Sequence, residues 1–258
     1  MSEPTIHHAA ADGYKQGADT YVRGRPDYPP AVAAWLSQAL GLKPGQTVLE
    51  VGAGTGKFTV RLLQTGARVI VIEPVPAMLE KLSGSYPEVE THQGTAQAIP
   101  LADASVDVVV CAQAFHWFAT REALAEMHRV LKPGGRLGLI WNLRDASVPW
   151  VAQLDALVNQ WEGDAPRFYT GAWRQAFPFA GFGPLQEQQF SQSHDGLVED
   201  VIFNRVRSTS FISALAPTDR ARLEQQLADF VVSQSALNHG GTVSVPYVTS
   251  AFVTLKGL

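Results

Sequence analysis

Several residue patterns that define particular protein classes are scarce in this sequence. A single cysteine, Cys111, occurs among 258 residues, so no intrachain disulfide can form and a reducing compartment suits the chain. No stretch reaches the ~18 uninterrupted apolar residues that a membrane-spanning helix needs. The first 25 residues contain no continuous apolar run, unlike a signal peptide. We therefore expect a soluble, cytoplasmic protein that does not associate with a membrane.

Positive charge is also scarce. Lys and Arg number 20 against 24 Asp and Glu, a formal net charge of −4, and no run of Lys or Arg exceeds two residues. Binding to nucleic acid or to an anionic surface depends on clustered positive charge, so we expect no nucleic-acid partner. The seven histidines and the cysteine show no HExxH or CxxC spacing, and no metal site is predicted.

What the sequence does contain is a regular alternation of strand-like and helix-like segments. Short β-branched or apolar runs occur at 47–51, 67–73, 106–112 and 136–141, with a weaker one at 89–93. The segments between them carry apolar residues at helical spacing. This alternation predicts an α/β protein with a doubly wound, mostly parallel sheet that has helices on both faces.

The second half of the chain is less regular. We expect a single domain over 1–258, with a cofactor-binding core at about 31–145 and irregular cap segments at about 146–238. Residues 242–255 read as a strand pair or one long strand, which would close the sheet at the C-terminus. Because that strand follows the cap, the cap is interpreted as an insertion, and a separate second domain is the less favoured interpretation.

A glycine cluster directly follows the first predicted strand. Gly52, Gly54 and Gly56 lie within five residues, between that strand and a helix. Residues without a Cβ let a ligand approach the backbone, whose free amides are expected to point out of the helix N-terminus. Glu73 ends the second strand and can accept hydrogen bonds from both hydroxyls of a ribose. The loop and the acid together predict an adenosine-containing ligand; the alternative is that the glycines only form a tight turn.

The glycine spacing distinguishes between adenosine ligands. It is G-x-G-x-G here, whereas the dinucleotide fingerprint is G-x-G-x-x-G. Glu50 lies two residues upstream of the loop, where a carboxylate would repel a pyrophosphate but accept from an ammonium group. These features favour S-adenosyl-L-methionine, which carries an ammonium group and no phosphate, over a dinucleotide.

Four segments of the chain resemble a known family in the family's own order. They are VLEVGAGTGKFT, VIEP, GTAQAIPLADASVDVVVCAQAFHWF and EMHRVLKPGGRLGLIWN. Together with YVRGRPDYP near the N-terminus, they resemble the class I S-adenosylmethionine-dependent methyltransferases, in particular the type 11 group that includes trans-aconitate methyltransferase-like enzymes. The resemblance covers roughly Tyr21 to Arg144 and implies a Rossmann-like methyltransferase fold with an antiparallel closing strand.

The resemblance implies a role for each matching position. The loop would border the methionine part of the cofactor, Glu73 would bind the ribose, and the sulfonium would lie over Gln113. Many relatives have aspartate at the position of Thr95, which can accept only through its hydroxyl. The cofactor-binding residues implied by the motifs, with Glu50 added, are Tyr21, Arg25, Glu50, Gly52, Ala53, Gly54, Glu73, Pro74, Thr95, Ala96 and Gln113. Among them, Tyr21 and Arg25 belong to a segment that would close over the cofactor, and Arg25 would clamp its carboxylate or be a surface cation.

The reacting end of the site is expected after the fourth and fifth strands. His116 is the candidate catalytic residue, because its ring can deprotonate an alcohol or hold a carboxylate; the alternative is a packed ring that bonds the backbone. Trp117 would wall the cavity or belong to the cap core. Asn142 and Arg144 would bind the substrate, with Arg144 anchoring an acid or pairing with Asp145 or another acid of the cap.

These observations predict a methyltransferase that uses S-adenosyl-L-methionine and releases S-adenosyl-L-homocysteine. The expected acceptor is a small molecule methylated on an oxygen or a carboxylate, with carbon and nitrogen acceptors less favoured. Two other classes remain open on sequence alone, a non-catalytic protein that binds the same cofactor and an NAD-dependent oxidoreductase.

Overall fold

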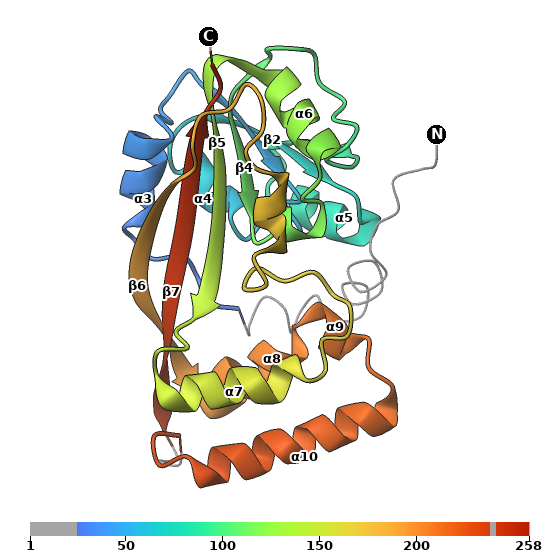
Figure 1. Ribbon diagram of the computed structural model, residues 1–258, viewed down its shortest axis with the longest axis vertical. Coiled ribbons are helices and arrows are strands. Elements are labelled where there is room, and N and C mark those ends of the chain that lie inside the picture. The colour runs from blue at the N-terminus through green and yellow to red at the C-terminus, as the bar shows by residue number, and fades with distance from the viewer. Residues whose placement is uncertain (1–24, 238–240, 258) are drawn as a thin grey trace.

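The computed structural model describes residues 25–237 and 241–257, and these form one seven-stranded sheet in the order β3-β2-β1-β4-β5-β7-β6 (Figure 1). The first five strands pair in parallel, and β7 pairs antiparallel with both β5 and β6. The strands are β1 (Thr47–Val51), β2 (Arg68–Glu73), β3 (Glu90–Gln93), β4 (Val106–Ala112), β5 (Leu131–Arg144), β6 (Gln186–Leu197) and β7 (Thr242–Leu255). The predicted doubly wound sheet with an antiparallel closing strand is confirmed.

Helical segments connect the strands and form the cap. The helices of the first half are α3 (Val32–Ala34), η1 (Trp35–Ala39), α4 (Thr59–Leu63), α5 (Pro76–Ser85), η2 (Phe115–Trp117) and α6 (Arg121–Val130). Those of the second half are α7 (Pro149–Asn159), η3 (Ala172–Ala176), η4 (Glu199–Asn204), α8 (Arg205–Arg207), α9 (Ser210–Ser213) and α10 (Pro217–Ser233). Within the described ranges, no helix has both the length and the apolar character needed to cross a membrane.

Both faces of the sheet are covered by helices, as the apolar central strands require. Successive side chains of a strand point to opposite faces, so Val109 of β4 packs in one core with Met127 of α6. The next residue, Val110, packs in a second core with Trp35 of η1 and Leu82 of α5. Burial on both faces explains why the predicted strands are continuously apolar rather than alternating.

The cap has a hydrophobic core of its own. Leu154 of α7, Val206 of α8 and Leu227 of α10 are buried there together with Tyr247 of β7. Farther along the same strand, Phe252 belongs to the core of the sheet. Figure 1 shows α7, α8 and α10 below the sheet, with the long strands β5, β6 and β7 reaching down to them. One continuous strand therefore joins the cap to the sheet.

The sequence interpretation of the cap was wrong for one segment. Residues 186–197 fall inside the predicted cap range of 146–238, yet they form β6, the edge strand of the sheet. All twelve of these residues pair with β7, from Gln186 opposite Val253 to Leu197 opposite Thr242. For residues 242–255, the sequence left open a strand pair or one long strand. The structure has one strand there, β7, and β6 from the preceding segment pairs with it.

Candidate active site

Two adjoining cavities lie at the carboxyl ends of the parallel strands, where β1 and β4 separate the two halves of the sheet. Ligands of open α/β sheets bind at this switch point because the connections leave in opposite directions there. We call the first the glycine-loop cavity and the second the arginine cavity. The residues that line both are Arg25, Gln113, Trp117, Asn142 and Arg205.

The glycine loop follows β1 and lines the first cavity. Gly52, Gly54 and Gly56 have φ values of +73°, +58° and +87°, a region that side chains with a Cβ rarely adopt. A Cβ on Gly52 would lie 2.8 Å from the Cβ of Ala114. The loop therefore requires glycine both for its backbone and for its close approach to the start of η2.

The expectation that the loop presents free amides to a ligand was wrong for its three glycines and for Ala53. The amides of Gly52 and Ala53 donate to the carbonyl of Ile72 at 2.8 and 3.4 Å, and that of Gly56 donates to Ala53. The amide of Gly54 donates to Oε2 of Glu73 at 2.8 Å. Because the protein itself uses these donors, the loop is no phosphate cradle, which fits a cofactor without phosphate.

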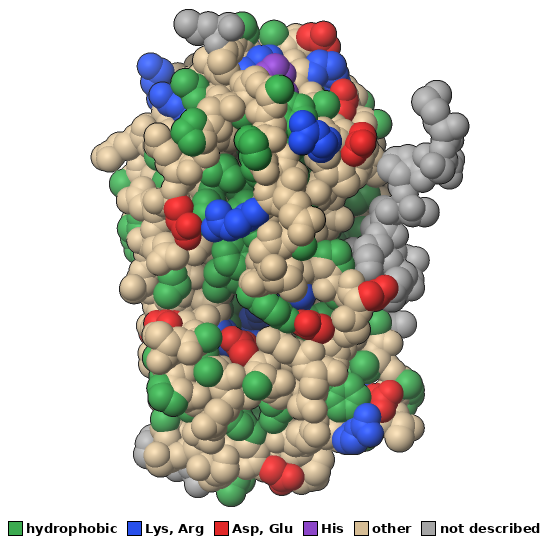
Figure 2. Space-filling view, viewed as in Figure 1, with side chains coloured by type: hydrophobic (Ala, Val, Ile, Leu, Met, Phe, Trp, Pro, Cys, Tyr) green, Lys and Arg blue, Asp and Glu red, His purple; other side chains and the backbone are tan. Residues whose placement is uncertain are grey.

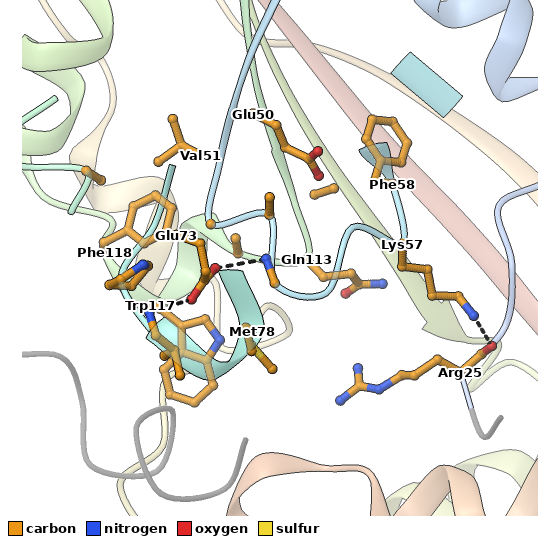
Figure 3. A pocket seen from close by; sticks show the side chains of 18 of the residues that line it. Arg25, Glu50, Val51, Lys57, Phe58, Glu73, Met78, Gln113, Trp117 and Phe118 are labelled. Atoms are coloured by element: carbon orange, nitrogen blue, oxygen red, sulfur yellow. Dashed lines mark hydrogen bonds between the residues drawn. The ribbon is translucent and has the colours of Figure 1, made fainter. Parts of the chain in front are cut away.

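Glu73 lies at the end of β2, where its carboxylate faces the glycine-loop cavity (Figure 3). Besides Gly54, the backbone amide of Val75 donates to its Oε1 at 3.0 Å. Burial raises the pKa of Glu73, and these two backbone donors oppose the rise. The carboxylate is thus held in one orientation, and its remaining lone pairs are available to the hydroxyls of a ribose.

Glu50 is the second carboxyl group of this cavity and is only 1% exposed. Its Oε2 accepts from the hydroxyl of Thr59 at 2.6 Å. Burial raises the pKa of Glu50 to about 8, and the nearby Glu73 adds to the rise. The position suits the sequence interpretation, since an ammonium group of a ligand would stabilise the ionised carboxylate there.

Two cations lie at the opposite side of the cavity from Glu73. Figure 3 shows Lys57 and Arg25 on the right of the view and Glu73 on the left. The ammonium of Lys57 donates to the carbonyl of Arg25 at 2.6 Å, and Nη2 of Arg25 donates to the carbonyl of Ser208 at 2.9 Å. A bound methionine carboxylate would find positive charge here. Lys57 was missed by the sequence analysis, and Tyr21 lies outside the described residues.

The other predicted cofactor residues line the same cavity. Pro74, Thr95 and Ala96 lie along its wall. Gln113 has a φ of +58°, and its side-chain amide donates to the carbonyl of Asn142 at 3.1 Å. The side-chain carbonyl oxygen of Gln113 remains available to a cationic group. The residues present therefore fit S-adenosyl-L-methionine. Carboxylates lie where its hydroxyls and its ammonium group would bind, and cations lie where its carboxylate would bind.

His116 of η2 lines the arginine cavity. Its Nδ1 accepts a hydrogen bond from the indole Nε1 of Trp141 at 3.0 Å. Burial lowers the pKa of His116 to about 3, and the positive charges of Arg167 and Arg25 contribute. His116 is thus neither bonded to the backbone nor a surface group, and its ring is neutral at physiological pH.

Asn142 and Arg144, at the end of β5, were predicted to bind a substrate. The side chain of Asn142 donates to the carbonyl of Asp27 at 3.2 Å, and its oxygen accepts from Thr249 at 2.6 Å. This leaves Asn142 a fixed part of the wall. The Nε of Arg144 donates to Asp155 of α7 at 2.6 Å, while its buried Nη1 has no hydrogen-bond partner. Arg144 therefore pairs with an acid of the cap, one of the two expected roles, and its role as a substrate anchor stays a prediction.

Two further arginines of the arginine cavity were missed by sequence reasoning. The guanidinium of Arg167 stacks on the ring of Phe211 at 4.8 Å, and burial lowers its pKa. Burial and the charge of Arg25 lower the pKa of Arg205 to about 10. Figure 2 shows Lys and Arg side chains recessed between the sheet and the cap. No motif marks these residues, because only cap folding brings them to the cavity.

A doubly wound sheet with a glycine loop and a buried acid at its switch point defines a class of α/β proteins that bind adenosine-containing cofactors. Comparison with known proteins narrows this class. The chain matches the family described as a methyltransferase domain over residues 49–139. An uncharacterized methyltransferase-like protein of Schizosaccharomyces pombe is 36% identical over 244 residues, which cover 94% of this chain and 95% of that protein. An uncharacterized methyltransferase of Mycobacterium tuberculosis is 37% identical over 229 residues, 89% of either chain.

Solved structures agree in fold. A putative Type II methyltransferase from Anaeromyxobacter dehalogenans superposes with a TM-score of 0.62 at 20% identity, covering 90% of this chain and 97% of that one. The chain belongs to the class I S-adenosylmethionine-dependent methyltransferases, in the type 11 group. The narrower resemblance to trans-aconitate methyltransferase-like enzymes stays a prediction.

Proposed function

We propose that this methyltransferase methylates a carboxylate oxygen of a small acceptor that carries more than one acidic group and binds in the arginine cavity. The observation that supports the proposal is the charge of that cavity. Its lining contains four arginines, Arg25, Arg144, Arg167 and Arg205, against one carboxylate, Asp155. Asp155 offsets one of these charges, and Arg25 also lies beside the expected position of the cofactor's carboxylate. At least two positive charges therefore remain for the acceptor, beside a cofactor whose sulfonium adds another.

Because these guanidinium groups are partly buried, their excess positive charge favours the binding of an anion. Partly buried cations repel each other and lose hydration unless an anion compensates them, and burial lowers the pKa of both Arg167 and Arg205. Guanidinium groups bind carboxylates through two parallel hydrogen bonds. The Nη1 of Arg144 and the Nε of Arg205 are buried without a hydrogen-bond partner, so the protein compensates these two guanidinium groups only in part. A neutral acceptor would leave them uncompensated.

The residues of the chain would divide the work between the two cavities. Glu73, Glu50 and the glycine loop would hold the cofactor, and the arginines would orient the acceptor. When bound, the cofactor would supply an electrophilic methyl group: a C–O bond would form as the C–S bond breaks, with its electron pair left on sulfur. The reacting carboxylate would become an uncharged ester group without loss of a proton. The chain contributes alignment and the exclusion of water.

A methylation assay tests the proposal. Purified protein is incubated with methyl-labelled S-adenosyl-L-methionine and small mono-, di- and tricarboxylic acids, together with the matching alcohols and amides. We expect label in alkali-labile methyl esters, with higher kcat/KM for acids that carry two or three carboxylates. Label found only in alkali-stable ethers, amines or carbon-methylated products would contradict the proposal.

A pair of arginine variants locates the acceptor. Arg167→Gln removes a cation of the arginine cavity, and we expect kcat/KM for the acid to fall about 10–100-fold, the value of a hydrogen bond to a charged group. Cofactor affinity, measured by calorimetry, should stay within about twofold. Arg174→Gln is the matched control, since Arg174 stacks on Trp173 outside both cavities. Equal effects of the two variants would exclude a specific role for Arg167.

A further inference from the structure

The hydrogen bond between Trp141 and His116 determines where the histidine carries its proton. An indole N–H is only a donor, so the Nδ1 of His116, 3.0 Å from Nε1 of Trp141, must be the acceptor. A neutral imidazole holds one proton, which is then on Nε2. Among the described residues, none is found to accept from Nε2, and the ring lines the arginine cavity. His116 can therefore donate into this cavity, and its accepting nitrogen is already engaged.

The donor side of this bond cannot reorient. Trp141 is only 1% exposed. Its ring centroid lies 4.9 Å from those of Phe168 and Trp173, and 5.8 Å from that of Phe252. Turning the indole away would leave its N–H buried without a partner, which costs about 1–3 kcal/mol. The packed aromatic cluster thus selects one tautomer of His116.

The charges around His116 keep the ring neutral. Arg167 of the cap and Arg25 of the N-terminal segment oppose its protonation, and Arg144 and Arg205 line the same cavity. The only carboxylate in the lining as described, Asp155, accepts from Arg144. Neither His116 nor Asp155 is therefore available to take a proton from a hydroxyl group.

We propose that His116 is a specificity residue, which donates a hydrogen bond from Nε2–H to an acceptor oxygen that is already anionic. Because His116 cannot act as a base, acceptors whose hydroxyl must first lose a proton are excluded. Trp141 is its positioning residue. The inference rests on the proposed function for the identity of the acceptor, but the tautomer is a property of the protein alone. The proposed role of His116 is thus to donate a hydrogen bond, in place of the deprotonation of an alcohol that the sequence analysis considered.

Nitrogen NMR of the ligand-free protein tests the tautomer directly. Long-range proton–nitrogen correlations on 15N-histidine-labelled protein separate protonated from unprotonated ring nitrogens, and His116→Gln identifies the signals. We expect an unprotonated Nδ1 and a protonated Nε2 that persist from pH 8 to about pH 5, since the ring titrates far below its usual range. A protonated Nδ1, or a titration between pH 6 and 7, would overturn the proposal even if the enzyme methylates carboxylates.

Kinetics test the hydrogen bond to the acceptor. Gln places an N–H close to the position of Nε2, whereas Leu removes it. We expect kcat/KM for the acid to fall about 10–100-fold in His116→Leu and to be partly restored in His116→Gln, with cofactor affinity unchanged in both. His92→Gln is the matched control, because His92 bonds Glu90 on β3 outside both cavities. Equal rates in His116→Leu and wild type would overturn the role.

Two further measurements separate donor from base. With the cofactor saturating at every pH, so that protonation of the cofactor-binding Glu50 has no effect, the kcat/KM of the wild type for the acid should be flat between pH 6 and 8. Under the same conditions, an analogue that carries an alcohol in place of the reacting carboxyl group should not be methylated. A tenfold loss of rate per pH unit below pH 7, or methylation of the alcohol, would show a base and overturn the proposal.

In Trp141→Phe, Nδ1 loses its donor, so we expect both tautomers of His116 in the NMR spectrum; an unchanged single tautomer would overturn the role of Trp141.

Discussion

At the scale of single residues, the least expected finding is the carboxyl group of Glu50. Desolvation penalises its charged form, and its pKa rises to about 8. In the free protein at neutral pH the group is therefore mostly protonated, although it lines the cavity that fits a cationic cofactor. An ammonium group nearby favours the ionised form. Binding of the cofactor and loss of a proton from Glu50 are consequently linked.

This linkage predicts how cofactor affinity depends on pH. Because the ionised form binds the ammonium group, affinity should rise about tenfold for each pH unit between pH 6 and 8, and level off above the pKa of the free protein. Calorimetry in buffers of different ionisation enthalpy should detect close to one proton released at pH 7. Glu50→Gln should remove both effects. A pH-independent affinity in the wild type would contradict the link.

At the scale of elements, the turn between β1 and α4 positions the site. Its positive φ values allow the chain to reverse beside η2, and the clash of any Cβ on Gly52 with Ala114 shows how closely the two connections approach. The loop amides bond to Ile72 and to the side chain of Glu73. The turn and the end of β2 therefore form one rigid unit, and a change in one displaces the other.

A comparison of alanine variants at two glycines distinguishes the cost of a positive φ from the cost of steric crowding by a new Cβ. Gly52 and Gly45 both have positive φ, but a Cβ on Gly45 meets nothing within 4 Å. Gly45→Ala should lower the free energy of unfolding by about 1–2 kcal/mol, the cost of a left-handed alanine. Gly52→Ala should lower it further and weaken cofactor binding at least tenfold, an order-of-magnitude expectation from displacing the loop. Urea unfolding and calorimetry measure both, and equal losses would contradict the role of the close approach.

At the scale of the whole molecule, the cap and the sheet share the acceptor site. Arg144 comes from β5 and Asp155 from α7, and this ion pair has a buried guanidinium, 7% exposed, against a carboxylate that is 26% exposed. Arg205 begins α8, and Arg25 bonds the carbonyl of Ser208 next to it. The arginine cavity exists only because these segments meet.

The ion pair across this boundary can be tested against an exposed one. Asp155→Asn leaves the buried Arg144 without a counter-charge, and we expect the free energy of unfolding to fall by about 1–3 kcal/mol. Asp219→Asn breaks the pair with Arg222, whose side chains are 44% and 65% exposed, and should cost at most about 0.5 kcal/mol. Chemical denaturation compares the two, and a loss no larger in Asp155→Asn would show that the pair does not hold the cap.

The sequence alone predicted the features that depend on near neighbours in the chain. The central strands, the glycine turn and Glu73 were found because strand patterns and loop chemistry extend over only a few residues. The chain order of strands and helices then predicted the parallel sheet, since right-handed crossovers leave few arrangements. In the same way, the motif resemblance covered the cofactor half of the site.

Tertiary structure alone decided what depends on distant segments. Residues 186–197 read as cap because an edge strand with a polar face lacks the apolar signal of a buried one, and only pairing with β7 assigns them to the sheet. Arg167 and Arg205 carry no motif, and the tautomer of His116 is set by an indole 25 residues away. Charge, burial and hydrogen bonding act through space, so these properties arise only where the folded chain brings the groups together.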